Sequence, residues 1–200
     1  LSEGNRTKTQ VIYAQRGIIQ DREGKPLVQN IPAFKTIENG KTSWIEKDKA
    51  LSEIAKNPES KISIDTQREY LYKDAFSHVL GYTGQIDQQK LLGNSDYSFG
   101  SFVGKMGLEK EYEGILRGQD GKALFEVTSQ GTTIRKLGTE EAVSGNNLKT
   151  TLDLDIQLAV EGAMRDVKKG AVVVSDPGSG AILAIYSKPS FDPNLFTHPK

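Results

Sequence analysis

The chain has 200 residues, of which 26% are charged and 36% hydrophobic, an ordinary composition for one large or two small folded domains. Its 26 basic and 26 acidic residues cancel to a formal net charge of zero, which argues against a nucleic-acid-binding protein. It contains no cysteine and only two histidines, His78 and His198, which excludes a disulfide framework, a thiolate metal site and a histidine-rich metal site.

The sequence of residues 1–26 predicts a polar lead-in followed by a strand and a turn. Residues 1–10 are polar, and the β-branched residues of 11–20, VIYAQRGIIQ, are typical of a strand. A turn is predicted at 21–26, where Gly24 and Pro26 interrupt regular structure. The chain is therefore expected to begin as a β structure.

The next segment predicts a hairpin. Residues 27–37 look extended but interrupted by Pro32, which cannot donate a backbone hydrogen bond to a neighbouring strand. The Asn39-Gly40 pair tolerates the positive φ angles of a type I′ turn, so a hairpin is expected there. The elements expected after it, in chain order, are a helix over 46–56, a strand over 61–67, a strand-like segment over 77–86, a mobile loop over 93–107, a short helix over 108–116, and a strand pair over 122–129 and 132–137.

The strongest predicted helix covers 153–168. Asp153 and Asp155 lie in its first turn and Lys168 in its last, a charge order that matches the helix dipole, and Gly170 is expected to end it as the C′ residue. Its apolar residues follow the 4-3-4 spacing of one helix face, at Ile156, Val160, Ala163 and Val167.

Two apolar strands are predicted after this helix, over 171–175 and 181–187, around the turn DPGSG. Both carry apolar residues on both faces, so both are expected to be covered on both sides in the mature fold. A helix followed by such a hairpin begins an α+β layer. The expected class is α+β, with a mostly β first part and short helices. Since only one strong helix is available as cover, we expect the chain to be part of a longer protein.

The segment RGIIQDREG places Arg16, Asp21 and Arg22 around a strand-to-turn corner. One interpretation is a surface hairpin with an exposed ion pair, which contributes about 0–1 kcal/mol to stability. The other is a buried network that uses the bidentate geometry of arginine to fix one module on another.

Two groups of acidic residues are candidate catalytic carboxylates, Glu109, Glu111 and Glu113 in one and Asp153 and Asp155 in the other. The first group alternates with lysine and other residues on a short helix, and the second has a helix-capping explanation. The segment DLDIQLAVE also lacks the glycine and loop character of a calcium site. Both groups are therefore interpreted as structural.

Five blocks, in this order, resemble class B penicillin-binding proteins. The first matches the family's RGxIxDRxG opening, and the second departs from the family at Leu71, where proline is usual. Residues 27–66 are the least diagnostic part of a resemblance that extends from about residue 1 to 195. The blocks are RGIIQDREG (16–24), REYLYKDAFSHVLGYTG (68–84), GKMGLEKEYEGILRGQDG (104–121), TTLDLDIQ (150–157) and GAVVVSDPGSGAILAIYSKPSFDPN (170–194).

The resemblance implies a parent protein that cross-links peptidoglycan stem peptides on the extracytoplasmic side of the cell membrane. Residues 1–150 would form the pedestal, or dimerisation, domain and 151–200 the start of the transpeptidase domain. The pedestal would hold the catalytic domain away from the bilayer, and the membrane anchor would lie outside this chain. Expected partners are a membrane glycosyltransferase and other cell-wall synthesis proteins, with peptidoglycan and its lipid-linked precursor reached through the missing catalytic domain. No nucleic acid, cofactor or metal is expected.

The chemistry of the family needs residues that this chain lacks. A serine must be deprotonated by a neighbouring lysine before it attacks the peptide carbonyl and forms an acyl-enzyme. The chain contains no S-x-x-K and no K-[TS]-G. No catalytic residue is assigned, and the chain is expected to be inactive alone.

The candidate site is instead structural. Arg16, Asp21, Arg22, Arg68 and Glu109 are expected to form a polar network that joins the pedestal lobes to the catalytic domain, because burying charges unpaired is costly. The full set of structural and interdomain candidates is Arg16, Gly17, Asp21, Arg22, Gly24, Arg68, Gly81, Gly104, Gly107, Glu109 and Asp153.

Two alternatives remain open at this point. One is a stand-alone secreted adaptor that kept the pedestal and lost the enzyme. The other is an independent hydrolase that uses the acidic clusters. An S-x-x-K motif encoded beyond Lys200 would favour the enzyme family over the adaptor, and a muropeptide-cleavage assay would test the hydrolase.

Overall fold

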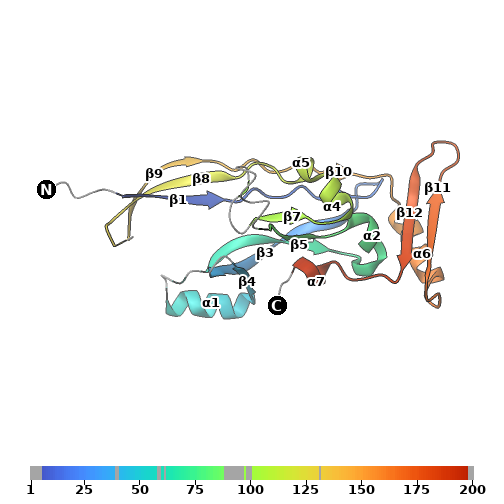
Figure 1. The fold of residues 1–200 in the computed structure, drawn as a ribbon, viewed down its shortest axis with the longest axis horizontal. Helices are drawn as coiled ribbons and strands as arrows, with labels where there is room; N and C mark the ends of the chain where they lie inside the picture. Colours follow the sequence, from blue (N-terminus) through green and yellow to red (C-terminus); the bar gives the residue numbers. More distant parts are fainter. Residues whose placement is uncertain are drawn as a thin grey trace.

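The structure is a computed structural model that describes residues 6–38, 41–57, 60, 62–87, 97, 101–130 and 132–197. It is built mainly of strands with short helices, so the expected α+β class is confirmed. The molecule is elongated, with the N-terminal strand at one end and the last hairpin at the other (Figure 1).

An antiparallel three-stranded sheet forms the first end of the molecule, in the order β1 (Arg6–Ile12), β8 (Gly121–Val127) and β9 (Thr133–Glu140). The hairpin predicted from 122–129 and 132–137 is thus confirmed. The strand predicted at 11–20 is wrong in its bounds, because β1 uses the polar lead-in and the chain leaves the sheet after Ile12. Polar side chains suit β1 because a sheet can keep one face in water.

The central sheet has the order β10-β2-β3-β4, with β5 also paired to β3. The predicted β3–β4 hairpin is confirmed by the pairing of Glu38 with Lys41, although residues 39–40 lie outside the described chain. Pro32 does not interrupt β3. It pairs with Thr66 on one side, and on the other side it falls between the segments that pair with β2 and β4. The strands are β2 (Ile19–Gln20), β3 (Pro26–Glu38), β4 (Lys41–Ile45), β5 (Ser63–Tyr70) and β10 (Leu148–Lys149).

Short elements connect these sheets, and two predictions for them are corrected. The segment 77–86 is helical in its first half because α2 continues the preceding 3-10 helix and ends at Gly81, whose φ is +73°. The helix predicted at 108–116 is broken at Tyr112. The elements are α1 (Lys47–Lys56), η1 (Lys73–Phe76), α2 (Ser77–Leu80), β6 (Thr83–Gln85), β7 (Phe102–Gly104), α4 (Gly107–Glu111) and α5 (Glu113–Leu116).

The helix and the strand predicted at 46–56 and 61–67 are confirmed as α1 and β5. The loop predicted at 93–107 contains strand β7, which pairs with β6. The expectation that this loop is mobile concerns mainly residues outside the described chain.

The second end of the molecule holds α6 (Leu154–Ala163) and the hairpin of β11 (Gly170–Ser175) and β12 (Ile182–Lys188) (Figure 1). Asp153 caps α6 as expected, its carboxylate accepting from two backbone N–H groups. The helix ends five residues earlier than predicted, and Gly170 begins β11 instead of ending the helix. After Ala163 the chain continues as turns, in which the Arg165 N–H donates to the Gly162 carbonyl and the Val167 N–H donates to the Met164 carbonyl, before β11 pairs with β12.

The hydrophobic core lies between the central sheet, the short helices and the start of α6. Helix α6 covers one face of β12, where Ala184 and Tyr186 are buried, whereas β11 contains no buried residue and Val173 is 60% exposed. The predicted two-sided cover of the hairpin is therefore absent from the described chain. The buried core cluster consists of Ile19, Leu27, Val28, Tyr70, Ala75, Phe76, Leu80, Leu116, Leu152 and Leu154.

Candidate functional site

Two arginines from distant segments bind one buried glutamate. Glu109, in the first turn of α4, is fully buried. Its Oε2 accepts from Arg16 Nε at 2.6 Å, and its Oε1 accepts from Arg68 Nε at 2.8 Å. Arg16 lies in the loop between β1 and β2, and Arg68 lies on β5. These contacts join three separate parts of the chain through one carboxylate.

A second carboxylate completes the charge balance. Arg16 Nη2 donates to Glu113 Oε2 at 2.7 Å and to the Glu109 carbonyl at 2.8 Å. The same Glu113 oxygen accepts from the Gly104 backbone N–H at 2.9 Å, which attaches β7 to the cluster. Two arginines thus face two glutamates, as buried charge requires. We call Arg16, Arg68, Glu109 and Glu113 the clamp.

Neighbouring polar groups fix the arginine side chains. Arg68 Nη1 donates to Asn30 Oδ1 at 3.0 Å, and the Asn30 amide donates to the Arg16 carbonyl. The Tyr70 hydroxyl donates to Glu109 Oε1 at 3.3 Å and accepts from the Thr83 N–H at 3.0 Å. The clamp therefore lies within a network that orients both guanidinium groups.

The electrostatics of the clamp favour the charged forms of Glu109 and Arg16. Burial would raise the pKa of Glu109, but the charges of Arg68 and Arg16 and their hydrogen bonds outweigh burial and lower that pKa. Burial tends to lower the pKa of Arg16, and the charges of Glu109 and Glu113 raise it instead. Burial and then the Glu109 charge raise the pKa of Tyr70. A carboxylate this saturated is not available as a general acid or base at neutral pH.

Glycines bring the backbones around the clamp into close approach. A Cβ at Gly81 would lie 1.8 Å from the Met106 carbonyl oxygen, and Gly81 and Gly107 both have positive φ angles. A Cβ at Gly104 would lie 2.1 Å from the Glu109 carbonyl oxygen, and one at Gly17 would lie 1.9 Å from the Asn146 carbonyl oxygen. These positions admit no side chain without movement of the backbone.

Asp21 and Arg22 lie apart from the clamp, so the predicted five-residue network is divided. Asp21 is buried, and its Oδ1 accepts from the backbone N–H groups of Glu23 and Lys25, at 2.8 Å each, across the turn that contains Gly24. The Arg22 N–H donates to the Leu152 carbonyl at 2.8 Å, and its half-exposed guanidinium lies 3.9 Å from Asp153 Oδ2. This corner therefore contacts the start of α6.

Two further residues, absent from the predicted set, connect α6 and the last segment to the rest. Gln157 is fully buried, and its amide bonds the Ala75 carbonyl in η1 and both backbone groups of Ile185 in β12. The Asn194 side chain bonds both backbone groups of Tyr70, at 2.9 and 3.0 Å. Both residues lie inside the blocks that resemble the family, and this position is the signal in the sequence that could have identified them.

The residues that the structure describes show the clamp as a set of paired charges. They contain no group of three or more histidine, cysteine, aspartate or glutamate side chains placed to hold a metal ion. No described helix has the length and apolar character needed to cross a membrane. The geometry can join chain segments rigidly, and this is what the arrangement supports.

Comparison with known proteins identifies a family that this chain matches. The family model for the penicillin-binding protein dimerisation domain matches residues 37–150. The peptidoglycan D,D-transpeptidase MrdA of Acinetobacter baumannii is 31% identical over 98% of this chain and 36% of its own length. The Haemophilus influenzae MrdA is 32% identical over 98% of this chain and 38% of its own length. The chain thus spans little more than a third of these curated relatives.

Solved structures resemble the fold. PBP2 from Pseudomonas aeruginosa, in complex with WCK 5153, matches with a TM-score of 0.64 and 28% identity over 95% of this chain and 32% of that chain. A peptidoglycan synthase complex contains a chain that matches with a TM-score of 0.71 and 28% identity, over 98% of this chain and 41% of that one. PBP2 from Helicobacter pylori, solved with MreC, has a TM-score of 0.77 at 22% identity, over 96% of this chain and 44% of that one.

Proposed function

Because the chain belongs to the penicillin-binding proteins that carry the dimerisation domain, we propose that it is the non-catalytic scaffold of a peptidoglycan D,D-transpeptidase. The clamp carries this proposal, since it locks three segments of the pedestal together and binds both oxygens of the Glu109 carboxylate to arginines. The absence of S-x-x-K from the sequence supports the same assignment.

Residues 1–150 form the pedestal in this proposal, and residues 151–200 begin the transpeptidase domain. Two observations support the boundary. The family model ends at residue 150, and α6 with the β11–β12 hairpin packs as a separate layer at one end of the molecule (Figure 1). The corner of Asp21 and Arg22 and the buried Gln157 would then act as the joint between the two parts, together with Asp153.

Labelling with a fluorescent penicillin tests the scaffold assignment. The 200-residue chain should remain unlabelled, because it lacks the serine and lysine that form the acyl-enzyme. A longer version that continues past Lys200 should be labelled. Covalent labelling of the 200-residue chain would contradict the proposal. A muropeptide-cleavage assay on the same chain should also be blank.

The exposed three-stranded sheet supports a role in partner binding. Every residue of β9 is exposed, including Ile134 at 55% and Leu137 at 44%. A strand with a free edge and apolar side chains can pair with another chain. We assign this surface to a partner from the cell-wall synthesis machinery outside the membrane, of the MreC or glycosyltransferase kind.

A binding assay with MreC from the same organism tests that surface. Ile134→Asp should weaken binding at least about tenfold, because it places a charge in an apolar contact. Leu51→Asp, on exposed α1, is the matched control and should leave binding unchanged. Equal affinities of both variants and the unmodified chain would exclude β9 as the MreC surface.

A further inference from the structure

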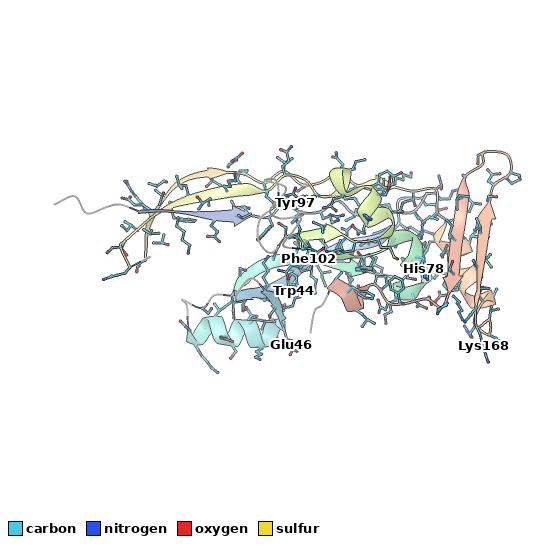
Figure 2. The ribbon with its side chains drawn as sticks, in the orientation of Figure 1. Trp44, Glu46, His78, Tyr97, Phe102 and Lys168 are labelled. Atoms are coloured by element: carbon cyan, nitrogen blue, oxygen red, sulfur yellow. The ribbon has the colours of Figure 1, made fainter. Side chains whose placement is uncertain are left out.

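A cavity of about 80 Å³ lies in the middle of the molecule, where β4, β5, β6 and β7 meet. Trp44 and Phe102 stand together there (Figure 2), with ring centroids 5.8 Å apart. The lining also includes Arg68 and Thr83. The cavity shares Arg16 and Arg68 with the clamp, whereas neither clamp glutamate belongs to its lining.

Three buried polar groups of the lining have no hydrogen-bond partner among the described residues. They are Trp44 Nε1, Arg68 Nη2 and Thr83 Oγ1. Arg68 and Thr83 are 5% and 1% exposed. Buried polar groups in folded proteins are nearly always bonded, and an unmet one is costly. Three such groups around one cavity, from three strands, therefore indicate a missing occupant.

The chemistry of these groups defines what the occupant must supply. Trp44 Nε1 and Arg68 Nη2 are donors, and the Thr83 hydroxyl can donate as well. The two lining carboxylates are already engaged, Asp65 by Lys35 and Asp120 by Arg117. The site thus offers donors, one of them cationic, beside two aromatic rings. It requires an acceptor that is preferably anionic, with a small apolar end.

We propose that this cavity binds a small carboxylate, of about the size of acetate. A carboxylate has two oxygens that can accept several hydrogen bonds at once, and its bond to a guanidinium is charge-assisted. Its methyl group would lie against Trp44 and Phe102. The volume also suits a few water molecules, so water alone is the competing occupant.

Nuclear magnetic resonance can test the proposal through a single signal. Trp44 is the only tryptophan, so its indole N–H gives one isolated resonance in a ¹⁵N-labelled sample of the full 200-residue chain. Titration with sodium acetate should move this resonance saturably. Sodium chloride at equal ionic strength and methylammonium chloride should not.

Two variants separate site binding from a general salt effect. Thr83→Val removes one hydroxyl at nearly constant shape and should weaken acetate binding about fivefold. Thr139→Val, on exposed β9, is the matched control and should bind acetate as the unmodified chain does. Trp44→Phe, followed by isothermal titration calorimetry, should also weaken binding. The proposal is contradicted if the indole resonance responds equally to acetate and chloride. It is also contradicted if Thr83→Val and Trp44→Phe both bind acetate with unchanged affinity. Either result would show that the cavity holds water only.

Discussion

The clamp and the terminal hairpin differ in how far their side chains are buried and paired within the chain. At the clamp, charged side chains are largely buried and are paired with one another within the chain. At the hairpin, apolar side chains such as Val173 remain exposed although the strands pair correctly. The first region balances its charges within the chain, and the second presents a surface that suits further packing.

This difference shows which interactions the pedestal fold requires. Buried ion pairs are costly to assemble, and breaking one leaves an uncompensated charge. The clamp therefore fixes which segments meet, while the core around Ile19 and Tyr70 contributes the hydrophobic stabilisation. The hairpin takes no part in the clamp, and it meets that core through β12, where Ile182 packs against the core cluster.

The largest expected effect comes from removing the central charge of the clamp. Glu109→Gln preserves shape but leaves Arg16 and Arg68 buried without their counter-ion, so the free energy of unfolding should fall by about 3–5 kcal/mol. Urea denaturation would measure it. The matched control is Glu111→Gln, on the exposed side of the same helix, which should change stability by less than about 0.5 kcal/mol. Similar losses in both variants would contradict the role of the clamp.

The second effect concerns the close backbone approach beside the clamp. Gly81→Ala would place a Cβ against the Met106 carbonyl at a positive φ, and it should destabilise the chain by about 2 kcal/mol or more. Gly114→Ala is the control, because a Cβ there meets nothing within 4 Å in helix α5, and it should stabilise by about 0.5–1 kcal/mol. Thermal unfolding of both variants would decide, and a tolerated Gly81→Ala would show that this packing is looser than described.

The third effect is the pH dependence of the clamp. The pKa of Glu109 is lowered in the folded chain from its ordinary value of 4.5. The ionised Glu109 therefore stabilises the fold fully above pH 4.5, and this stabilisation is lost as the pH falls through the lower, folded-state pKa. The difference in unfolding free energy between the unmodified chain and Glu109→Gln should therefore shrink below pH 4.5. The loss should total about 1.4 kcal/mol per unit of pKa lowering. Urea titrations from pH 7 to pH 3 would measure it, and a constant difference would contradict a lowered pKa.

The smallest effect is expected at the hairpin. Val173→Thr should change the stability of the 200-residue chain by less than about 0.5 kcal/mol, because the side chain is exposed. In a longer protein whose further residues cover β11, the same substitution should cost about 1–3 kcal/mol, because the hydroxyl would be buried. Calorimetry on both proteins would compare the two values. An equal, small effect in both would mean that β11 stays exposed.

Sequence patterns predict the local elements and identify the family-like blocks, but they do not predict the long-range contacts. Alternation and turn signals located the β3–β4 and β11–β12 hairpins, since both depend on neighbouring residues. The predicted length of α6 is too great, because the apolar spacing continues to Val167 whereas the chain after Ala163 forms turns. The polar lead-in was misjudged because its partner β8 lies over a hundred residues away.

The same limit applies to the candidate site. Arg16, Arg68 and Glu109 were selected from motif positions, and the structure brings them together. Asn30 and Glu113 complete the network, but neither has a local pattern that distinguishes it from a surface residue. The three unpartnered groups of the central cavity likewise come from three segments, so only the folded arrangement brings them together.

Hydrogen exchange tests most directly the proposal that the pedestal packs within the 200-residue chain, whereas the terminal hairpin becomes covered in a longer protein. In the 200-residue chain, amides of β5 at 63–70 should exchange orders of magnitude more slowly than those of β11 at 170–175, since exposed and weakly packed segments open locally. In a protein that continues past Lys200, the β11 amides should become protected while those of β5 stay unchanged. Equal, strong protection of β11 and β5 in the 200-residue chain would contradict the account.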